Sequence, residues 1–474
     1  MTTQLVNDKV NINEILTATK LLSEKYLSRQ NDLPPGRHVS DLSIESLPHE
    51  GIGAEAALRY FEANYAEQMT NSAGPRYFGF VTGGSTPAAL AGDWLVSTYD
   101  QNACGSNDSI APQLERQTIH FFKELFGLDE CYFGSFVTGA TMSNFTSLAI
   151  ARQWVGEQRN IDFSMDGLFN SNPIKVVSGT PHSSITKSLS MLGMGRKSVV
   201  RIATLPEREA VDIQALESYL QQHREPLIVV ANAGTVNTVD FDDLAALGEL
   251  KSQYNLWLHV DAAFGGFAAC SGKFSHFLDG INNADSVTID AHKWLNVPYD
   301  AAMQFTRHKD LQLKIFQNSA AYLTEPEKSP DFFHYTPENS RRFRALPSWF
   351  TLMAYGRDGY REIVERNCSM AHRLGNLINS SDNFRLLAPV RMNVVCFTLS
   401  HANVSTDEIR MFLNAIRDDG RAFFPPTVYQ GIPAVRAAVS NWLTSDEDME
   451  ISYCALNEVH QTLYNRKQDI AVIS

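Results

Sequence analysis

The chain has 474 residues, 44% hydrophobic and 20% charged, a composition typical of a soluble globular protein with length for two or three domains. Its formal net charge of −13 argues against nucleic-acid or anionic-membrane partners, since both need clustered lysine and arginine. No apolar run approaches the roughly 20 residues that span a bilayer. No secretion signal opens the chain, and its six cysteines form no CxxC pair. We therefore expect a cytoplasmic protein with no metal site.

Residues 1–82 are predicted to form an N-terminal helical arm. Residues 12–22 have the spacing of an amphipathic helix, and Pro34, Pro35 and Gly36 then interrupt the pattern. An arm this thin cannot enclose a core of its own. We expect it to pack on another subunit as a dimerisation segment.

Residues 83–345 are predicted to form a large α/β domain. Short β-branched runs at 174–178, 227–231, 256–260 and 286–290 alternate with helical stretches such as 213–220. This alternation favours a mainly parallel sheet with helices on both faces. Functional groups in such sheets cluster beyond the C-terminal strand ends, and Asp261, Lys293 and residues 234–235 all follow strand ends.

The last part of the chain is predicted to hold a lid and a smaller domain. Residues 319–340 contain three prolines and several charges, which indicates a long loop that could act as a lid. Helices follow, and then strands at 386–390 and 393–398. We expect residues 346–474 to form a small C-terminal α+β domain.

Lys293 and Asp261 together fit the needs of pyridoxal phosphate (PLP). A lysine is usually an exposed surface residue, but Lys293 has apolar flanks, and an imine to a carbonyl cofactor is one way to bury its amine. Aspartate after a strand is commonly a turn or cap residue. Small residues follow Asp261, so a flat ring could approach it, and an ionised carboxylate would keep the ring nitrogen protonated.

Two further segments could complete a PLP site. His182 follows the strand at 174–178, where its ring could stack on the cofactor opposite the lysine. Residues 138–144, Thr-Gly-Ala-Thr-Met-Ser-Asn, precede a helical stretch and could cradle a phosphate with backbone N–H groups. Neither signal is specific alone, because a lone histidine is more often structural and such runs cap many helices without a ligand.

These segments, in this order and spacing, resemble the group II PLP-dependent amino-acid decarboxylases, the family of aromatic-amino-acid and glutamate decarboxylases. The resemblance implies PLP fold type I, similar to aspartate aminotransferase, with a mainly parallel seven-stranded sheet and a homodimer whose active sites lie at the subunit interface. It implies that Lys293 forms the Schiff base, that Asp261 pairs with the pyridinium and that His182 stacks on the ring. It further implies a set of residues around the cofactor, namely Ala140, Thr141, Thr235, Ala263 and His292.

The resemblance also suggests substrate contacts. Arg436 matches an arginine that binds a substrate carboxylate in glutamate decarboxylases, although an arginine there could equally form a surface salt bridge. Tyr77 and Phe80 supply aromatic surface. Gln101 lies in the segment 97–103, which is polar where aromatic-specific enzymes carry larger apolar residues. This segment does not favour an aromatic substrate.

Two positions depart from the family pattern. Asp290 replaces an asparagine that donates to the phosphate in many members, so we expect Asp290 to hydrogen-bond backbone or hydroxyl groups instead. Phe332 replaces a loop tyrosine to which the family assigns protonation of the carbon after CO₂ leaves, and phenylalanine cannot donate a proton. Tyr335 or His334 could take over that role.

The sequence thus predicts a PLP-dependent decarboxylase that converts a small L-amino acid to its amine and CO₂ through a Lys293 Schiff base. One alternative is a decarboxylating oxidative deaminase that releases aldehyde, ammonia and peroxide, because Phe332 lacks a hydroxyl. The other is a PLP-binding scaffold subunit without catalysis.

Overall fold

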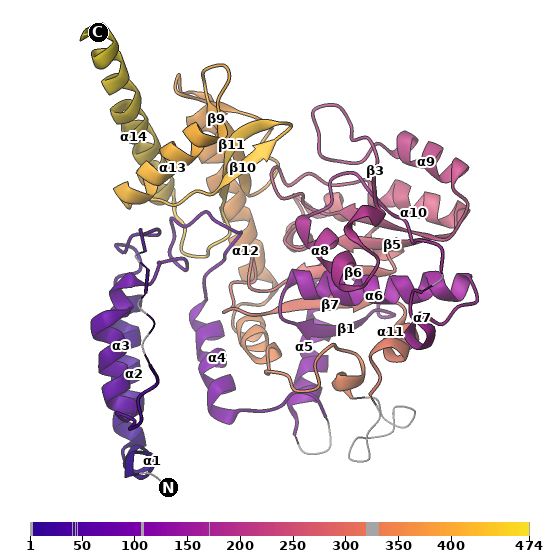
Figure 1. Cartoon of the computed structure of the whole chain (residues 1–474), viewed down its shortest axis with the longest axis horizontal. Helices are drawn as coiled ribbons and strands as arrows, with labels where there is room; N and C mark the ends of the chain where they lie inside the picture. The colour runs from indigo at the N-terminus through magenta and orange to yellow at the C-terminus, as the bar shows by residue number, and fades with distance from the viewer. Residues whose placement is uncertain are drawn as a thin grey trace.

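The computed structural model describes residues 3–473 except 40, 43, 45, 106–108, 170 and 319–330, with side chains up to residue 464. The chain opens with the helices α1 (Thr3–Val10), α2 (Ile12–Leu27), α3 (Ala54–Asn64) and η1 (Ala66–Gln68). Helices α2 and α3 pack side by side and form an arm beside the main body (Figure 1). The predicted helical arm is therefore present.

A seven-stranded sheet forms the centre of the molecule. Its strands are β1 (Phe133–Val137), β2 (Val176–Ser178), β3 (Val199–Arg201), β4 (Leu227–Asn232), β5 (Leu256–Asp261), β6 (Ser286–Asp290) and β7 (Ala302–Thr306). They lie in the order β1-β7-β6-β5-β4-β2-β3, and only β7 runs antiparallel to its neighbours. The mainly parallel seven-stranded sheet is confirmed, and the four predicted strands are β2, β4, β5 and β6.

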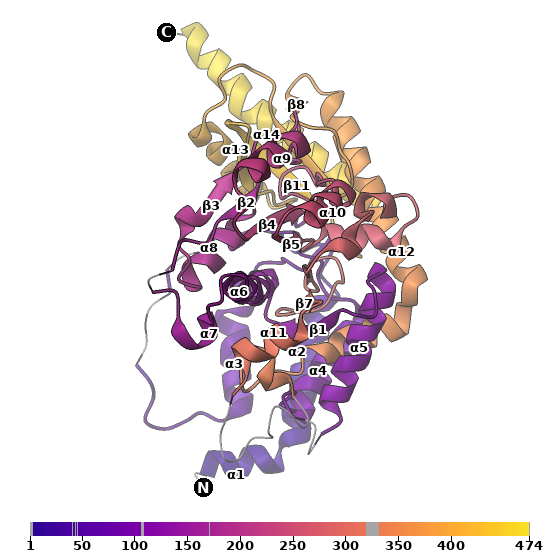
Figure 2. The same cartoon turned by 90° about the vertical axis from the view of Figure 1, so that its right-hand side faces the viewer.

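Helices cover the sheet and enclose its core. They are α4 (Pro87–Tyr99), α5 (Ala111–Phe126), α6 (Ala140–Gln158), α7 (Phe163–Asp166), α8 (Ser183–Met191), η2 (Arg196–Ser198), α9 (Ile213–Gln222), α10 (Leu244–Gln253), η3 (Gly265–Cys270), η4 (Ser275–Leu278), η5 (Ile281–Asn283) and α11 (Lys309–Phe316). The central helix α6 packs on β5, β6 and β7, and also on α8 and α11 (Figures 1 and 2). Large side chains such as Trp257, Trp294 and Phe305 are fully buried in this core.

The C-terminal part contains a second, smaller sheet. Its elements are α12 (Ala345–Asn379), β8 (Phe384–Leu386), β9 (Val394–Leu399), α13 (Thr406–Asp419), β10 (Pro426–Tyr429), β11 (Ile432–Ala438) and α14 (Asp446–Ile473). The strands pair antiparallel in the order β10-β11-β9-β8. The strand predicted at 386–390 begins two residues earlier and ends four residues earlier, because Pro389 has no N–H for a ladder and the pairing lies at 384–386.

The described part of the predicted lid, which begins at residue 331, is packed against the protein and is not a free loop. Residues 319–330 lie outside the described part of the chain. The segment that follows forms the short helix η6 (Phe332–His334), and Phe332, His334 and Tyr335 are buried. Aromatic side chains drive this burial, since the Tyr335 ring packs 4.5 Å from the Phe133 ring of β1.

Candidate active site

The C-terminal ends of the parallel strands gather functional side chains around one cavity of about 710 Å³. Asp261 ends β5, Lys293 follows β6, and His182 lies between β2 and α8. The cavity is also lined by other residues that the sequence singled out, namely Ala140, Thr141, Thr235, Ala263, His292, Phe80 and Arg436. Strand-end placement therefore brings the predicted cofactor residues together.

Lys293 lines this cavity beside the Asp290 carboxylate and the His292 ring. Its Nζ is 3.3 Å from Asp290 Oδ2, and His292 Nδ1 is 3.2 Å from Asp290 Oδ1. The expectation that Asp290 hydrogen-bonds backbone or hydroxyl groups is wrong, since the turn after β6 places the Lys293 amine and the His292 ring beside its carboxylate. Desolvation lowers the pKa of His292 below its ordinary value, and Asp290 offsets part of this effect.

Gly83 is in close contact with the backbone of Lys293. A Cβ added to Gly83 would lie 1.8 Å from the carbonyl oxygen of Lys293, which no side chain tolerates. The segment that contains Gly83 therefore packs directly on the backbone of the turn that carries the lysine.

The Asp261 carboxylate is held by two donors and is almost fully buried. Asn144 Nδ2 donates to Asp261 Oδ2 at 2.9 Å, and the backbone N–H of Ala263 donates to Asp261 Oδ1 at 3.2 Å. Asn144 belongs to α6, in the segment predicted as a phosphate cradle. Sequence reasoning missed its link to Asp261, because the two residues lie far apart along the chain and no local pattern pairs them.

His182 caps α8 and opens onto the cavity. Its Nδ1 lies 2.8 Å from Ser184 Oγ and accepts from the backbone N–H of Ser184 at 3.2 Å. Desolvation by the surrounding protein lowers the pKa of His182, and the Asp261 carboxylate raises it by less. The imidazole is therefore neutral at pH 7.

The start of α6 offers N–H groups to an anion. Gly139 precedes the helix, and no side chain among the described residues caps it. Gly139 lets the His292 ring pack close to the start of the helix, since a Cβ at this position would lie 3.3 Å from His292 Cε1. An uncapped helix start, an amine, a carboxylate and an imidazole in one cavity of this size fit the phosphate, aldehyde, ring nitrogen and ring face of PLP.

Arg436 and Phe80 line the cavity, whereas Tyr77 and Gln101 lie outside its lining. Arg436 Nη1 donates to Val236 O at 3.2 Å, and its buried Nε has no hydrogen-bond partner among the described residues. Tyr77 stacks on Phe423 with ring centroids 4.7 Å apart. Gln101 is exposed and donates to Tyr99 O at 2.8 Å.

Glu209 is a cavity residue that the sequence did not reveal. Its carboxylate accepts from the hydroxyls of Thr235 at 2.5 Å and Thr238 at 2.7 Å, and from Asn237 Nδ2 at 3.2 Å. The Thr235 hydroxyl also accepts from the N–H of Asp240 at 2.9 Å. Thr235 is thus fixed by Glu209 before any ligand is bound. A single glutamate in a loop carries no sequence signal for this role.

Phe332, His334 and Tyr335 are not brought to the cavity of their own chain. The Phe332 ring lies between the guanidinium groups of Arg116 and Arg341, at 5.2 and 5.0 Å from its centroid. Burial raises the pKa of Tyr335 to about 12. The Phe332 and Tyr335 rings pack against Phe133 at the start of β1, at the opposite end of the sheet from the strand ends that carry Asp261 and Lys293.

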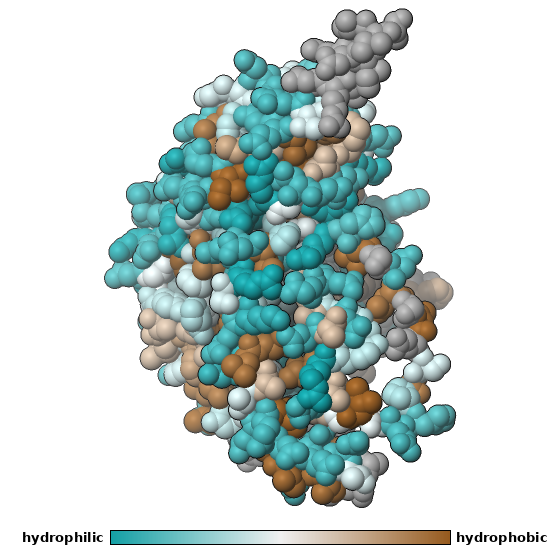
Figure 3. All heavy atoms as spheres, turned by 90° about the vertical axis from the view of Figure 1, so that its left-hand side faces the viewer, coloured by the Kyte–Doolittle hydropathy of each residue, from teal (hydrophilic) through white to brown (hydrophobic). Residues whose placement is uncertain are grey.

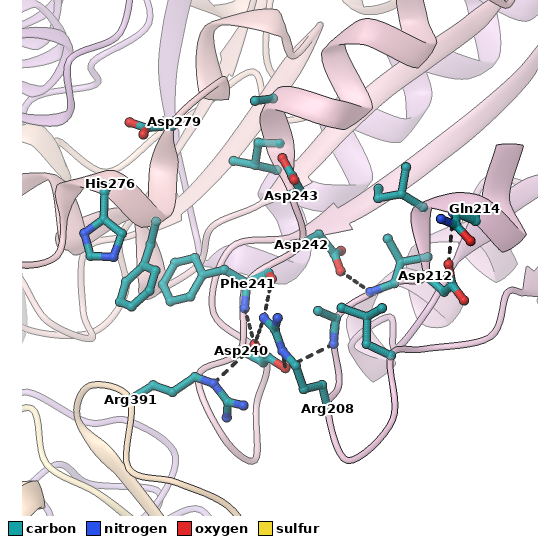
Figure 4. A pocket seen from close by; sticks show the side chains of 17 residues that line it. Arg208, Asp212, Gln214, Asp240, Phe241, Asp242, Asp243, His276, Asp279 and Arg391 are labelled. Carbon is teal, nitrogen blue, oxygen red and sulfur yellow. Dashed lines mark hydrogen bonds and ion pairs between the residues drawn. The ribbon is translucent and has the colours of Figure 1, made fainter.

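A second cavity of about 710 Å³ lies between the loops before α9 and α10 (Figure 4). Two of its arginines lie beside one carboxylate. Asp240 accepts from Arg208 at 2.6 Å and lies 3.4 Å from Arg391 Nε, while Asp242 accepts from the N–H of Val211. This cavity has no lysine in its lining, so it does not compete with the Lys293 cavity as a PLP site.

The described residues contain no group of three or more histidine, cysteine, aspartate or glutamate side chains that could hold a metal ion. Among the same residues, no helix combines the length and the apolar character needed to cross a membrane.

The sheet and the cavity at its strand ends define a PLP-dependent enzyme. The family model of the pyridoxal-dependent decarboxylase conserved domain matches residues 38–400, and the chain belongs to that family. It is a PLP-dependent carboxy-lyase, and its cofactor is PLP.

Relatives and solved structures agree with this assignment. The chain is 28% identical over 419 residues to aromatic-L-amino-acid decarboxylase of Bacillus atrophaeus, covering 85% of each. It is 25% identical to phenylacetaldehyde synthase of Petunia hybrida, over 91% of this chain and 89% of the relative. Its fold is similar to that of Oryza sativa TDC, crystallised with PLP and tryptamine, with a TM-score of 0.87, 21% identity and coverage of 96% and 98%.

Proposed function

We propose that the chain decarboxylates an L-amino acid to the corresponding amine and CO₂, with Lys293 as the residue that binds PLP covalently. One observation carries the proposal. The Lys293 amine lies in the same cavity as the Asp261 carboxylate, the His182 ring and the uncapped start of α6. When bound, PLP supplies an aldehyde for covalent attachment of amines and a ring that takes up the electrons left when CO₂ departs.

Each side chain has a role in this proposal. Asp261 holds a proton on the ring nitrogen of the cofactor, and His182 packs on the ring face. Ala140 and Thr141 offer backbone N–H groups to the phosphate. Arg436 lines the cavity, and its buried Nε has no hydrogen-bond partner among the described residues; it binds the substrate carboxylate through its planar guanidinium. Lys293 exchanges its covalent link for that of the substrate amine.

The proton donor for the carbon that loses CO₂ is part of the proposal. Tyr335 and His334 carry the phenol and the imidazole in the described part of the segment 319–340, and we assign the proton donor to one of them. Both are buried away from the cavity of their own chain. In a homodimer with active sites at the interface, this segment would serve the neighbouring cavity.

The exposed arm supports that homodimer. Helices α1, α2 and α3 have no buried residues in the described chain. Leu5, Leu16 and Leu21 are more than half exposed, at 59%, 59% and 58%. Apolar side chains lie among polar ones on this face of the molecule (Figure 3). A second copy that covers them would bury this surface, and light scattering of the purified chain would give its mass.

A second candidate function follows from Phe332. If no side chain protonates the carbon, O₂ can accept its electrons, and the substrate, O₂ and water give aldehyde, CO₂, ammonia and hydrogen peroxide. The absence of a hydroxyl at position 332 and the likeness to a relative named phenylacetaldehyde synthase favour this outcome.

The test is a panel of L-amino acids scored for CO₂, amine and peroxide. We expect purified protein to be yellow, and borohydride to fix PLP to the wild type and to the Lys187→Ala control, whose lysine is exposed on α8. Lys293→Ala should lose this fixation and lose turnover. A colourless protein that takes up no PLP would contradict the proposal, and a yellow protein that releases no CO₂ would favour the non-catalytic scaffold.

A further inference from the structure

A chain of hydrogen bonds, buried around Asn144 and part-buried at His182, links the Asp261 carboxylate to the His182 ring. The side-chain nitrogen of Asn144 lies 2.9 Å from Asp261 Oδ2 and 3.1 Å from Ser184 Oγ. Its oxygen lies 3.0 Å from His259 Nε2. Because an ionised carboxylate only accepts, the amide must direct its NH₂ group to Asp261, and its oxygen then faces His259.

This amide orientation fixes the tautomer of His259. The Asn144 oxygen can only accept, so His259 Nε2 carries the hydrogen. His259 Nδ1 then accepts from the hydroxyl of Ser286 at 2.9 Å, and Trp257 Nε1 donates to the same hydroxyl oxygen at 3.1 Å. Burial lowers the pKa of His259 to about 4, so the ring is neutral and one hydrogen satisfies it. Every donor in this part of the chain has an acceptor.

The other end of the chain fixes the tautomer of His182. The Ser184 oxygen accepts from Asn144, so its own hydrogen is free to point to His182 Nδ1 at 2.8 Å. The backbone N–H of Ser184 points to the same nitrogen at 3.2 Å. Two donors converge on Nδ1, which therefore carries no hydrogen, and the neutral ring holds its hydrogen on Nε2.

We propose that Asn144 and Ser184 are positioning residues that join Asp261 to His182 and hold the His182 hydrogen on Nε2, at the ring edge directed away from Ser184. His182 then presents an N–H donor, and not an acceptor, to an anionic oxygen of the molecule in the cavity. The chemical use of that donor rests on the proposed function, whereas the tautomer itself does not. Residues from α6, α8, β5 and β6 meet in this one chain of bonds, together with His182 from the loop before α8.

The test reads the tautomer directly. Full-length protein loaded with PLP and carrying ¹⁵N-labelled histidine rings is examined by NMR, and His182→Gln assigns the His182 signals. We expect the wild type to show a protonated Nε2 and an unprotonated Nδ1. Ser184→Ala keeps only the backbone N–H as a donor to His182 Nδ1, so we expect the population protonated at Nε2 to fall, and Ser184→Thr should keep it. Ser183→Ala is the matched control, because Ser183 is exposed and contributes only its carbonyl to a neighbouring hydrogen bond.

Cofactor affinity supplies the second measurement. Asn144→Ala removes a hydrogen bond to a charged group, so we expect PLP to bind about tenfold to a hundredfold more weakly while borohydride still fixes it to Lys293. A hydrogen on His182 Nδ1 in the wild type, or a wild-type pattern in Ser184→Ala, would overturn the proposal. Absence of turnover with the expected tautomer would instead contradict the proposed function alone.

Discussion

The Asp290 carboxylate lies between two basic side chains, 3.3 Å from Lys293 Nζ and 3.2 Å from His292 Nδ1. His292 in turn borders Gly139 at the start of α6, where the phosphate of PLP is proposed to bind. A carboxylate near this position stabilises the lysine cation before the cofactor arrives, and it repels the phosphate afterwards.

We therefore expect Asp290→Asn to bind PLP more tightly. Removal of one like charge near the phosphate contributes about 1 kcal/mol or more, because the Asp290 carboxylate is buried, and this is at least a roughly fivefold gain in affinity. Fluorescence titration of the apoprotein with PLP measures it. Pyridoxal, which lacks the phosphate, is the control ligand and should show no such gain. An equal gain for both ligands would place the effect on the lysine and not on the phosphate.

Arg436→Met should raise KM far more than it lowers kcat. Arg436 is buried in β11, and its side chain makes one hydrogen bond among the described residues, to Val236 O, so its remaining donors are available to a carboxylate. Loss of a buried charged contact of this kind is worth about 2–5 kcal/mol in binding. Steady-state kinetics on the best substrate of the panel measures both constants.

Arg201→Ala is the matched control for this experiment. Arg201 lines the same cavity but is exposed at the end of β3, where charges are screened by solvent. We expect its KM to change by less than about threefold. Arg436→Lys should restore only part of the affinity, because an ammonium lacks the planar fork of donors. Equal effects at Arg201 and Arg436 would argue against a specific carboxylate contact.

The sequence predicted the parts of this site that depend on local patterns. Asp261 and Lys293 each follow a short β-branched run, and the strand-end rule then places them at one edge of a parallel sheet. Strand β7 escaped prediction because it contains the buried polar residues Gln304 and Thr306 and gains its antiparallel place only by pairing with β1 and β6.

The partners of the site residues could not be predicted either, because they also depend on contacts between residues that are distant in the sequence. Asn144 reaches Asp261 across 117 residues of chain, and neither residue type signals the other. From the sequence we expected Asp290 to avoid the phosphate and to hydrogen-bond backbone or hydroxyl groups. The backbone turn after β6 decided instead that it meets Lys293 and His292.

His259 should make the protein less stable in acid. Burial lowers its pKa from 6.5 to about 4, so between these values the unfolded chain binds a proton that the folded chain excludes. The free energy of unfolding therefore falls as pH decreases through this window, by roughly 3 kcal/mol for this one group. We expect His259→Gln to be less stable than the wild type at pH 7, and this deficit to shrink toward pH 4. Urea unfolding at several pH values measures it.

Asp242 provides a control with the opposite sign. Burial raises its pKa from 3.8 to about 6, so the folded chain holds a proton that the unfolded chain releases, and the stability it contributes is lost as pH rises through this window. The free energy of unfolding of Asp242→Asn should therefore fall furthest below that of the wild type at low pH. A deficit of His259→Gln that stays constant with pH would contradict the assigned tautomer and neutral charge of His259.

Phe332→Tyr separates the two candidate reactions. If the wild type releases any aldehyde and peroxide, we expect a hydroxyl at position 332 to raise the ratio of amine to peroxide, since it returns a proton donor to the segment. The new hydroxyl also has a cost, because Phe332 is only 1% exposed between Arg116 and Arg341. A buried hydroxyl without an acceptor lowers the free energy of unfolding by about 1–3 kcal/mol.

The matched control is Phe333→Tyr, which places the same hydroxyl on the adjacent residue of η6, where the side chain is 6% exposed. Products are measured with a peroxide assay and by chromatography of the amine, and stability by urea unfolding. A loss of stability with an unchanged product ratio would mean that residue 332 stays packed against β1 during turnover. The donor would then have to be sought at Tyr335 or His334, and Tyr335→Phe should in that case raise peroxide at the expense of amine.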